Sequence, residues 1–457
     1  MTFFLPLFFI SLIFIFPQLV SAHAFGTLYN LPVPFWLYLY GAGATLLVSF
    51  LIIGYFVNSS GQDLDSKKSL PKLNLLLADW CKDLLKAISV FLFLLTIITG
   101  LLGTNNSLLN FNMTFFWIIF LLGLTYLTAL LGNIYFLLNP WKIIVEWLEN
   151  ILGEIKGAYK YPKNFSFYPA LIFYFLFIWS ELFGSITPFK LSIIVIQYSV
   201  ITFLGVILFG KIWFQCGEFF GVFFNLLAKI SPLIIVDNKI YLRPPFLGLV
   251  KDRAEDFSLV IFIIFMLAST AYDGFHSTIV WMKLVLSFSD SFYRLIQEAG
   301  LILAPMLFLV IFLLLIWLMR VFVKTNFTLK ELALKFSFSL VPIALAYNLA
   351  HYYTLLITQG QEIIKLISDP FNFGWNLFGT ASYKSNLAIV NAGFVWHSQV
   401  AVILLGHIAA VYLAHRISLE IFSNHKQAVI SQLPMLILMI IYTMTGLWIL
   451  SQPIGGG

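Results

Sequence analysis

Residues 299–322 read AGLILAPMLFLVIFLLLIWLMRVF, an apolar stretch whose single charged residue, Arg320, comes near its end. One α-helix needs about 20 apolar residues to cross the hydrocarbon core of a bilayer. Its backbone groups must pair within the helix, because the bilayer core offers no water. The apolar residues are continuous and do not alternate with polar ones, which argues against a β-barrel strand. This stretch therefore predicts a transmembrane helix.

The rest of the chain shares this composition. Of the 457 residues, 61% are hydrophobic and only 10% are charged. A soluble domain carries about 25% charged residues, so most of this protein's surface must face lipid. The 49 Phe, 20 Tyr and 12 Trp residues suit lipid-facing helices with aromatic belts. No basic tract is present, so we expect the lipid bilayer, and no nucleic acid, as a partner.

Recurring apolar segments predict an all-α, polytopic transmembrane bundle of about ten spans. The predicted spans cover residues 36–56, 88–102, 114–138, 167–188, 191–210, 257–273, 299–322, 336–358, 396–415 and 431–452. Residues 216–236 are also apolar, but a crossing there would place three basic residues outside and reverse all later spans. We interpret them as an inner interfacial or re-entrant helix. Residues 361–380, rich in aromatic side chains, are expected at the outer interface.

The positions of the basic residues predict the orientation. With the N-terminus outside, 21 of the 26 Lys and Arg residues fall in inner loops, as the positive-inside rule requires. We therefore expect a multi-pass protein of the inner (cytoplasmic) membrane with both mature termini outside. Cys81 and Cys216 then lie in inner loops, where we expect unpaired thiols.

The N-terminal segment has the features of a signal peptide. Residues 3–20 are nearly all apolar, and Val20-Ser21-Ala22 fits a signal-peptidase site. We expect a signal peptide over residues 1–22 and a single transmembrane domain over 23–457, beginning at His23. Cleavage after Ala24 is an alternative, and an uncleaved segment would add one span. N-terminal sequencing of the purified protein distinguishes these cases.

Ionisable groups inside a bilayer are costly, and each is a candidate for function. Glu181 and Asp273 are the candidate catalytic residues, as acids or bases. The candidate metal ligands are His276, His351, His397 and a free N-terminal His23. Imidazole and carboxylate ligands together suit zinc, copper or iron. All of these groups map to the outer half of the bilayer or its edge, so we expect one outward-opening polar cavity.

Helical spacing indicates which faces meet. Tyr347, His351, Thr354 and Thr358 form one polar stripe at i, i+4, i+7 and i+11. Ser269, Asp273 and His276 repeat this spacing, provided that the helix continues past Gly274, and Glu181 and Ser185 are four residues apart. Polar faces turned to lipid would be expensive. We therefore predict that His351 lies near Glu181, Asp273 or His276.

Purely structural roles remain open for the same residues. The role of His351 could equally be a hydrogen bond to a neighbouring helix. Asp273 could cap a helix or form an ion pair with Arg294. His397, beside Trp396, suits an interfacial anchor. The remaining histidines are interpreted as a packing residue, His407, and as inner-surface residues, His415 and His425.

Several stretches resemble a known family. They are residues 23–50 (HAFGTLYNLPVPFWLYLYGAGATLLVSF), 131–141 (LGNIYFLLNPW), 217–232, 271–278 (AYDGFHST), 339–361, 368–380 (SDPFNFGWNLFGT) and 434–453. Together they resemble a family of bacterial polytopic membrane proteins that sometimes carry the label fenitrothion hydrolase. The label implies hydrolysis of organophosphate esters, a reaction that commonly uses a metal-activated water.

Three classes of function are compatible with the sequence. The first is a membrane-embedded, metal-dependent hydrolase of organophosphate-like esters. The second is a small-molecule or ion transporter that uses the same polar faces as its path. The third is a non-catalytic copper-handling or assembly subunit, for which an N-terminal His23 would be the main sign.

Overall fold

The structure, a computed structural model, is a bundle of membrane-length helices. It describes residues 22–24, 27–29, 31–57, 68–70, 78–236, 239–288, 290–422 and 424–452. Within these residues, nine helices are long and apolar enough to cross a membrane. One shorter apolar helix, α8 (Tyr168–Phe183), joins them. The prediction of an all-α polytopic bundle is confirmed, while nearly all of the predicted signal peptide lies outside the described residues.

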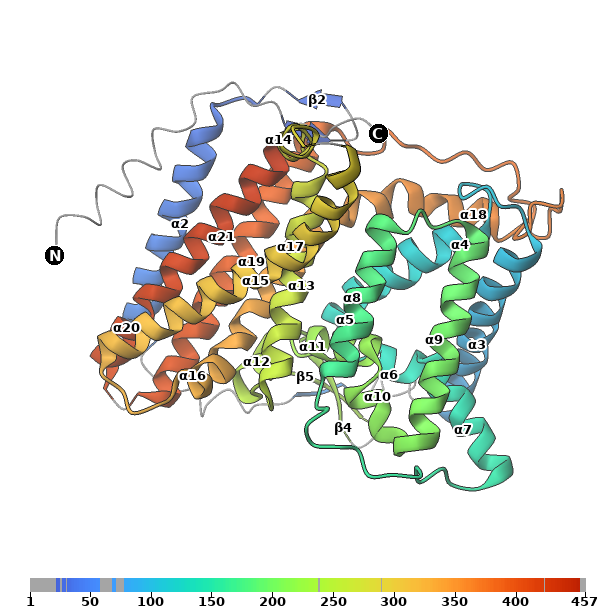
Figure 1. The fold of residues 1–457 in the computed structure, drawn as a ribbon, viewed down its shortest axis with the longest axis horizontal. Coiled ribbons are helices and arrows are strands. Elements are labelled where there is room, and N and C mark those ends of the chain that lie inside the picture. The colour runs from blue at the N-terminus through green and yellow to red at the C-terminus, as the bar shows by residue number, and fades with distance from the viewer. Residues whose placement is uncertain are drawn as a thin grey trace.

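The helices pack in two groups (Figure 1). The first group is continuous in sequence: α3 (Asp79–Leu102), α4 (Phe111–Met113), η3 (Thr114–Gly123), α5 (Leu124–Leu131), α6 (Tyr135–Leu138), α7 (Pro140–Leu152), α8, α9 (Pro188–Phe209), η4 (Gly210–Ile212), α10 (Trp213–Cys216) and α11 (Phe219–Ala228). The second group contains α2 (Phe35–Phe56), α12 (Leu247–Lys251), α13 (Phe257–His276), α14 (Ile279–Leu286), α15 (Asp290–Val323), α16 (Leu329–Phe336), η5 (Ser337–Leu340), α17 (Val341–Ile357), α19 (Ala392–Ile421), α20 (His425–Ser431) and α21 (Leu433–Ser451). Two short elements, η6 (Gln359–Gln361) and α18 (Glu362–Leu366), follow α17 and contact η3.

Helix α2 joins the second group although it precedes the first group in the chain. It packs against α19 and α21, and its buried residues are Phe35, Ala42, Leu46 and Phe50. The Phe35 ring lies 6.4 Å from the ring of Trp396 on α19. The N-terminal span is thus held by the last spans of the chain.

The connecting segments divide between the two ends of the bundle (Figure 1). One end carries α14, α18 and the antiparallel pair β1 (Ala22–Ala24) and β2 (Thr27–Tyr29). The other carries α7, α10, α16, α20 and an antiparallel sheet of β3 (Lys68–Ser69), β5 (Lys239–Leu242) and β4 (Leu233–Val236). β4 and β5 therefore lie at the end opposite to α18, as the predicted topology requires.

Labelling of single cysteines tests which end faces outward. With Cys81 and Cys216 replaced by alanine, we expect an impermeant maleimide to label Ser382→Cys in intact cells but not Pro245→Cys. Both native side chains are exposed, so both variants should react once the membrane is permeabilised. The reverse pattern would contradict the orientation derived from the basic residues.

Several helices differ in extent from the predicted spans. The segment predicted as one span over residues 114–138 is interrupted after Leu131, because Gly132 adopts φ of 94° and a Cβ there would lie 2.9 Å from the Leu233 carbonyl oxygen. α3 begins at Asp79 and α15 at Asp290, both earlier than predicted. Helices continue past the apolar run, because charged residues are tolerated beyond the bilayer core.

The apolar segment 216–236 enters and leaves at one end of the bundle. η4 and α10 precede it and β4 ends it, and Figure 1 places α10 and β4 at the same end. Eight of the ten residues of α11 are buried, so this helix packs inside the protein. The re-entrant alternative of the prediction fits this arrangement, and the interfacial alternative does not.

A close approach of α3 and α9 depends on Gly100. A Cβ at this position would lie 2.1 Å from Ser192 Oγ and 2.4 Å from the carbonyl oxygen of Pro188. We expect Gly100→Ala to destabilise the protein by about 1–3 kcal/mol, because the helices must separate. Thermal unfolding in detergent measures this. Gly43→Ala in α2 is the matched control, since nothing lies within 4 Å of its added Cβ; an equal loss in both variants would contradict the prediction.

Candidate functional site

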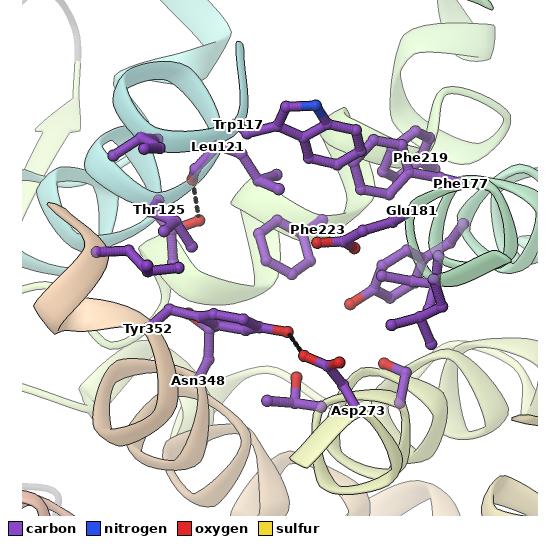
Figure 2. Close-up of a pocket in the computed structure, with 18 residues that line it drawn as sticks. Trp117, Leu121, Thr125, Phe177, Glu181, Phe219, Phe223, Asp273, Asn348 and Tyr352 are labelled. Carbon is purple, nitrogen blue, oxygen red and sulfur yellow. Dashed lines mark hydrogen bonds between the residues drawn. The ribbon is translucent and has the colours of Figure 1, made fainter. Parts of the chain in front are cut away.

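A cavity of about 120 Å³ lies between the two helix groups. Its walls come from η3, α5, α8 and α11 of the first group and from α13 and α17 of the second. Figure 2 shows that Glu181 and Asp273 point into the same space from opposite sides. Two carboxylates on separate helix groups therefore face one cavity within the bundle.

Asp273 is the centre of a hydrogen-bonded cluster in the last turn of α13. Its Oδ2 lies 3.2 Å from His351 Nε2 and accepts a hydrogen bond from the hydroxyl of Tyr352. His276 lies one turn further along α13, with Nδ1 4.0 Å from Asp273 Oδ1. The side chains of Asp273 and His351 are each 20% exposed. The predicted proximity of His351 to Asp273 is confirmed.

Glu181 approaches the same cavity from the last turn of α8. Among the described residues, its carboxylate accepts no hydrogen bond, and aromatic rings of α11 and α8 surround it in Figure 2. An ionised carboxylate in such surroundings is expensive without a partner. Glu181 is therefore the group at this site with the greatest need for a ligand or a proton.

The cavity-lining face of α17 is rotated from the predicted stripe. Asn348, Tyr352 and Leu355 line the cavity, whereas the stripe contained Tyr347, His351, Thr354 and Thr358. Consecutive helical residues differ by about 100°, so His351 and Tyr352 reach Asp273 from either side. The buried Thr358 hydroxyl bonds to the carbonyl oxygen of Thr354 within its own helix.

The polar face predicted for α13 agrees with the structure. The helix continues past Gly274 and ends at His276. Ser269 and Asp273 both line the cavity, as their spacing of four residues predicts. This face of α13 therefore supplies the polar side of the cavity wall.

The predicted pairing of Glu181 with Ser185 on one helical face is wrong. α8 ends at Phe183, and Ser185 adopts φ of 45°, which turns the chain away from the helix. The next helix, α9, begins at Pro188 and is capped by Thr187, whose side chain accepts a hydrogen bond from the Lys190 amide. Glu181 is therefore the last ionisable residue of α8, and Ser185 belongs to the loop that follows.

The remaining predicted ligands lie apart from the Asp273 cluster. His397 Nε2 is 3.2 Å from the Tyr38 hydroxyl, and its Nδ1 is 2.7 Å from the Gly393 carbonyl oxygen. These contacts tie α19 to α2, in keeping with an anchor. The backbone of His23 lies in β1, opposite Leu28 of β2. Among the described residues, no three His, Cys, Asp or Glu side chains are grouped so that they could hold a metal ion.

Two of the structural alternatives are corrected. Arg294 pairs with Glu298 at 2.8 Å and not with Asp273, because the two residues are one turn apart on α15. His415 is fully buried and is not a surface residue. Its Nδ1 accepts from Gln432 Nε2 at 2.8 Å, and its Nε2 donates to the Val57 carbonyl oxygen at 2.8 Å. His407 is buried, as expected of a packing residue.

A further carboxylate, that of Glu218, was not predicted. It is fully buried at the start of α11 and accepts hydrogen bonds from the Tyr198 hydroxyl at 2.8 Å and the Gly221 amide at 2.8 Å. Further donors are the Tyr135 hydroxyl, the Asn139 side-chain amide and the Phe220 amide. Glu218 therefore fixes the start of the re-entrant segment. The Cys-Gly-Glu sequence before an apolar run was the available signal, since carboxylates favour helix N-termini.

Comparison with family models, curated proteins and solved structures gives no match for this chain. The chain is an integral membrane protein by the length and composition of its helices. Its function is therefore inferred from its own residues.

Proposed function

We propose that the protein is a membrane carrier that binds a small cation at Asp273 and Glu181 and moves it across the bilayer. The observation that carries this proposal is the convergence of two carboxylates from opposing helix groups on one cavity. Carboxylates inside membrane proteins typically mark ion or substrate paths. Transporters commonly place such sites between two helix bundles that move relative to each other.

Two buried polar atoms on the neighbouring helices α17 and α19 also support a path. Tyr347, one turn from His351, has no hydrogen-bond partner for its hydroxyl within the described chain, and Nε2 of His407 has none either. α17, which carries Tyr347, packs on α19, which carries His407. Buried polar groups normally have partners, and water or a passing cation would provide them here.

Charge movement in reconstituted vesicles tests the carrier proposal. Vesicles containing the purified protein would be adsorbed to a solid-supported membrane and exposed to sodium, potassium, ammonium, propylammonium and zinc ions in turn. We expect a saturable current for at least one cation. Currents no larger than those of empty vesicles for every cation would overturn the proposal.

A second candidate is the hydrolase of organophosphate-like esters, and the pairing of Asp273 with His351 favours it. A carboxylate that orients an imidazole prepares it to take a proton from water, and Glu181 faces the same cavity. In a metal-dependent version, His276 and His351 would be the ligands of zinc, copper or iron, whereas the other predicted ligands, His397 and His23, lie apart from the Asp273 cluster. Two measurements on the purified protein test this candidate. One is its metal content, and the other is the release of nitrophenol from a nitrophenyl phosphotriester. A protein that neither binds metal nor releases nitrophenol would exclude it.

A further inference from the structure

We propose that the cation is a small alkylammonium ion that carries N–H groups and an apolar body. This inference rests on the proposed function, because it names the substrate class of the same cavity. It follows from the chemistry of the cavity walls, from one oxygen atom without a partner, and from the size of the space.

Six of the 18 residues that line the cavity are aromatic (Figure 2). The aromatic residues that line it are Trp117, Tyr174, Phe177, Phe219, Phe223 and Tyr352. The faces of such rings attract cations, while their edges and the neighbouring leucines suit an alkyl group. The cavity offers too few oxygen ligands for a hard metal ion, since calcium takes about 6–8 of them.

Two further polar groups, Asn348 and Ser269, line the cavity. Within the described chain, Asn348 Oδ1 forms no hydrogen bond, whereas the Ser269 hydroxyl has the Tyr174 hydroxyl as a neighbour. Together with the carboxylate of Glu181, they provide acceptors for a ligand with several N–H donors. A quaternary ammonium ion has no N–H group, so it would leave the Asn348 oxygen and the Glu181 carboxylate without a donor.

The size of the cavity limits the apolar body. Its volume is about 120 Å³, and an engineered apolar cavity of about 150 Å³ holds benzene. A primary amine with three or four carbons fits this space. Propylammonium is therefore the probe that the cavity predicts, and tetramethylammonium is the matched cation without N–H groups.

Isothermal titration calorimetry on the full-length protein in detergent tests the inference. We expect saturable binding of propylammonium and at least about tenfold weaker binding of tetramethylammonium and sodium. Trp117→Leu should weaken propylammonium binding about tenfold, whereas Trp117→Phe should retain most of it. Trp80→Leu is the control for loss of an indole, because Trp80 is 71% exposed.

The outcomes separate this inference from the carrier proposal. Equal binding of tetramethylammonium or sodium, no propylammonium binding, or unchanged affinity in Trp117→Leu would each overturn the alkylammonium assignment. Currents driven only by inorganic cations would overturn it as well while leaving the carrier proposal intact. Propylammonium binding without any current would instead overturn the carrier proposal and leave the ligand assignment standing.

Discussion

Replacing Glu218 with alanine should leave the protein unable to accumulate as a folded species in the membrane. The variant removes the acceptor of five donors: the hydroxyls of Tyr135 and Tyr198, the Asn139 side-chain amide and the backbone amides of Phe220 and Gly221. Each buried donor without a partner costs about 1–3 kcal/mol. The loss should therefore reach several kcal/mol, a large part of a typical stability of about 5–15 kcal/mol.

Expression and size-exclusion chromatography in detergent measure this effect. Glu218→Gln should be milder than alanine, because its amide oxygen still accepts hydrogen bonds while its amide nitrogen adds an unwanted donor. Glu154→Ala is the matched control, since the Glu154 side chain is 68% exposed and its removal should change stability by less than about 0.5 kcal/mol. Normal yield and thermal stability of Glu218→Ala would contradict the structural role assigned to this residue.

Replacing Asp273 with asparagine should strongly weaken cation-driven current while the protein remains folded. Asparagine keeps the shape of the side chain but removes the charge that pairs with a cation and with His351. Loss of one partner of a buried, hydrogen-bonded charge pair costs about 2 kcal/mol or more, which corresponds to about 30-fold in affinity. We expect the concentration for half-maximal current to rise by at least this factor.

The solid-supported membrane assay and a thermal-unfolding curve distinguish loss of function from loss of fold. Asp79→Asn is the control, because it makes the same chemical change at a side chain that is 93% exposed. Tyr352→Phe keeps the ring in the cavity wall and removes the hydroxyl that bonds to Asp273, so it should have a smaller effect. Full current in Asp273→Asn would contradict the role of this carboxylate.

The sequence was sufficient for the fold class and for part of the site. Continuous apolar runs are imposed by the bilayer, so the number and approximate position of the spans follow from composition alone. The i, i+4 spacing of Ser269 and Asp273 likewise fixes which side of α13 carries polar groups, and both line the cavity. The expectation that His351 meets Asp273 followed from the cost of exposing either to lipid.

The rest depends on tertiary contacts that no local pattern encodes. Tyr352 was overlooked because an aromatic residue next to a polar stripe suits lipid equally well, and only the position of α13 turns its hydroxyl to Asp273. Glu218 was overlooked because its donors include Tyr135 and Asn139, which are about 80 residues distant in the chain. The division into two helix groups could not be predicted either, because the hydropathy of a helix does not indicate which other helices it packs against.

The placement of α2 has a consequence for biosynthesis. This helix is made long before the helices that cover its buried face, α19 and α21, which lie far along the chain from it. At translation rates of about 5–20 residues per second, α2 waits on the order of tens of seconds before its partners emerge. It contains no charged residue, so it can remain in lipid without a partner during that interval. The bundle closes around α2 only after α19 and α21 have been made, so the insertion of these two helices is the step that completes this part of the fold.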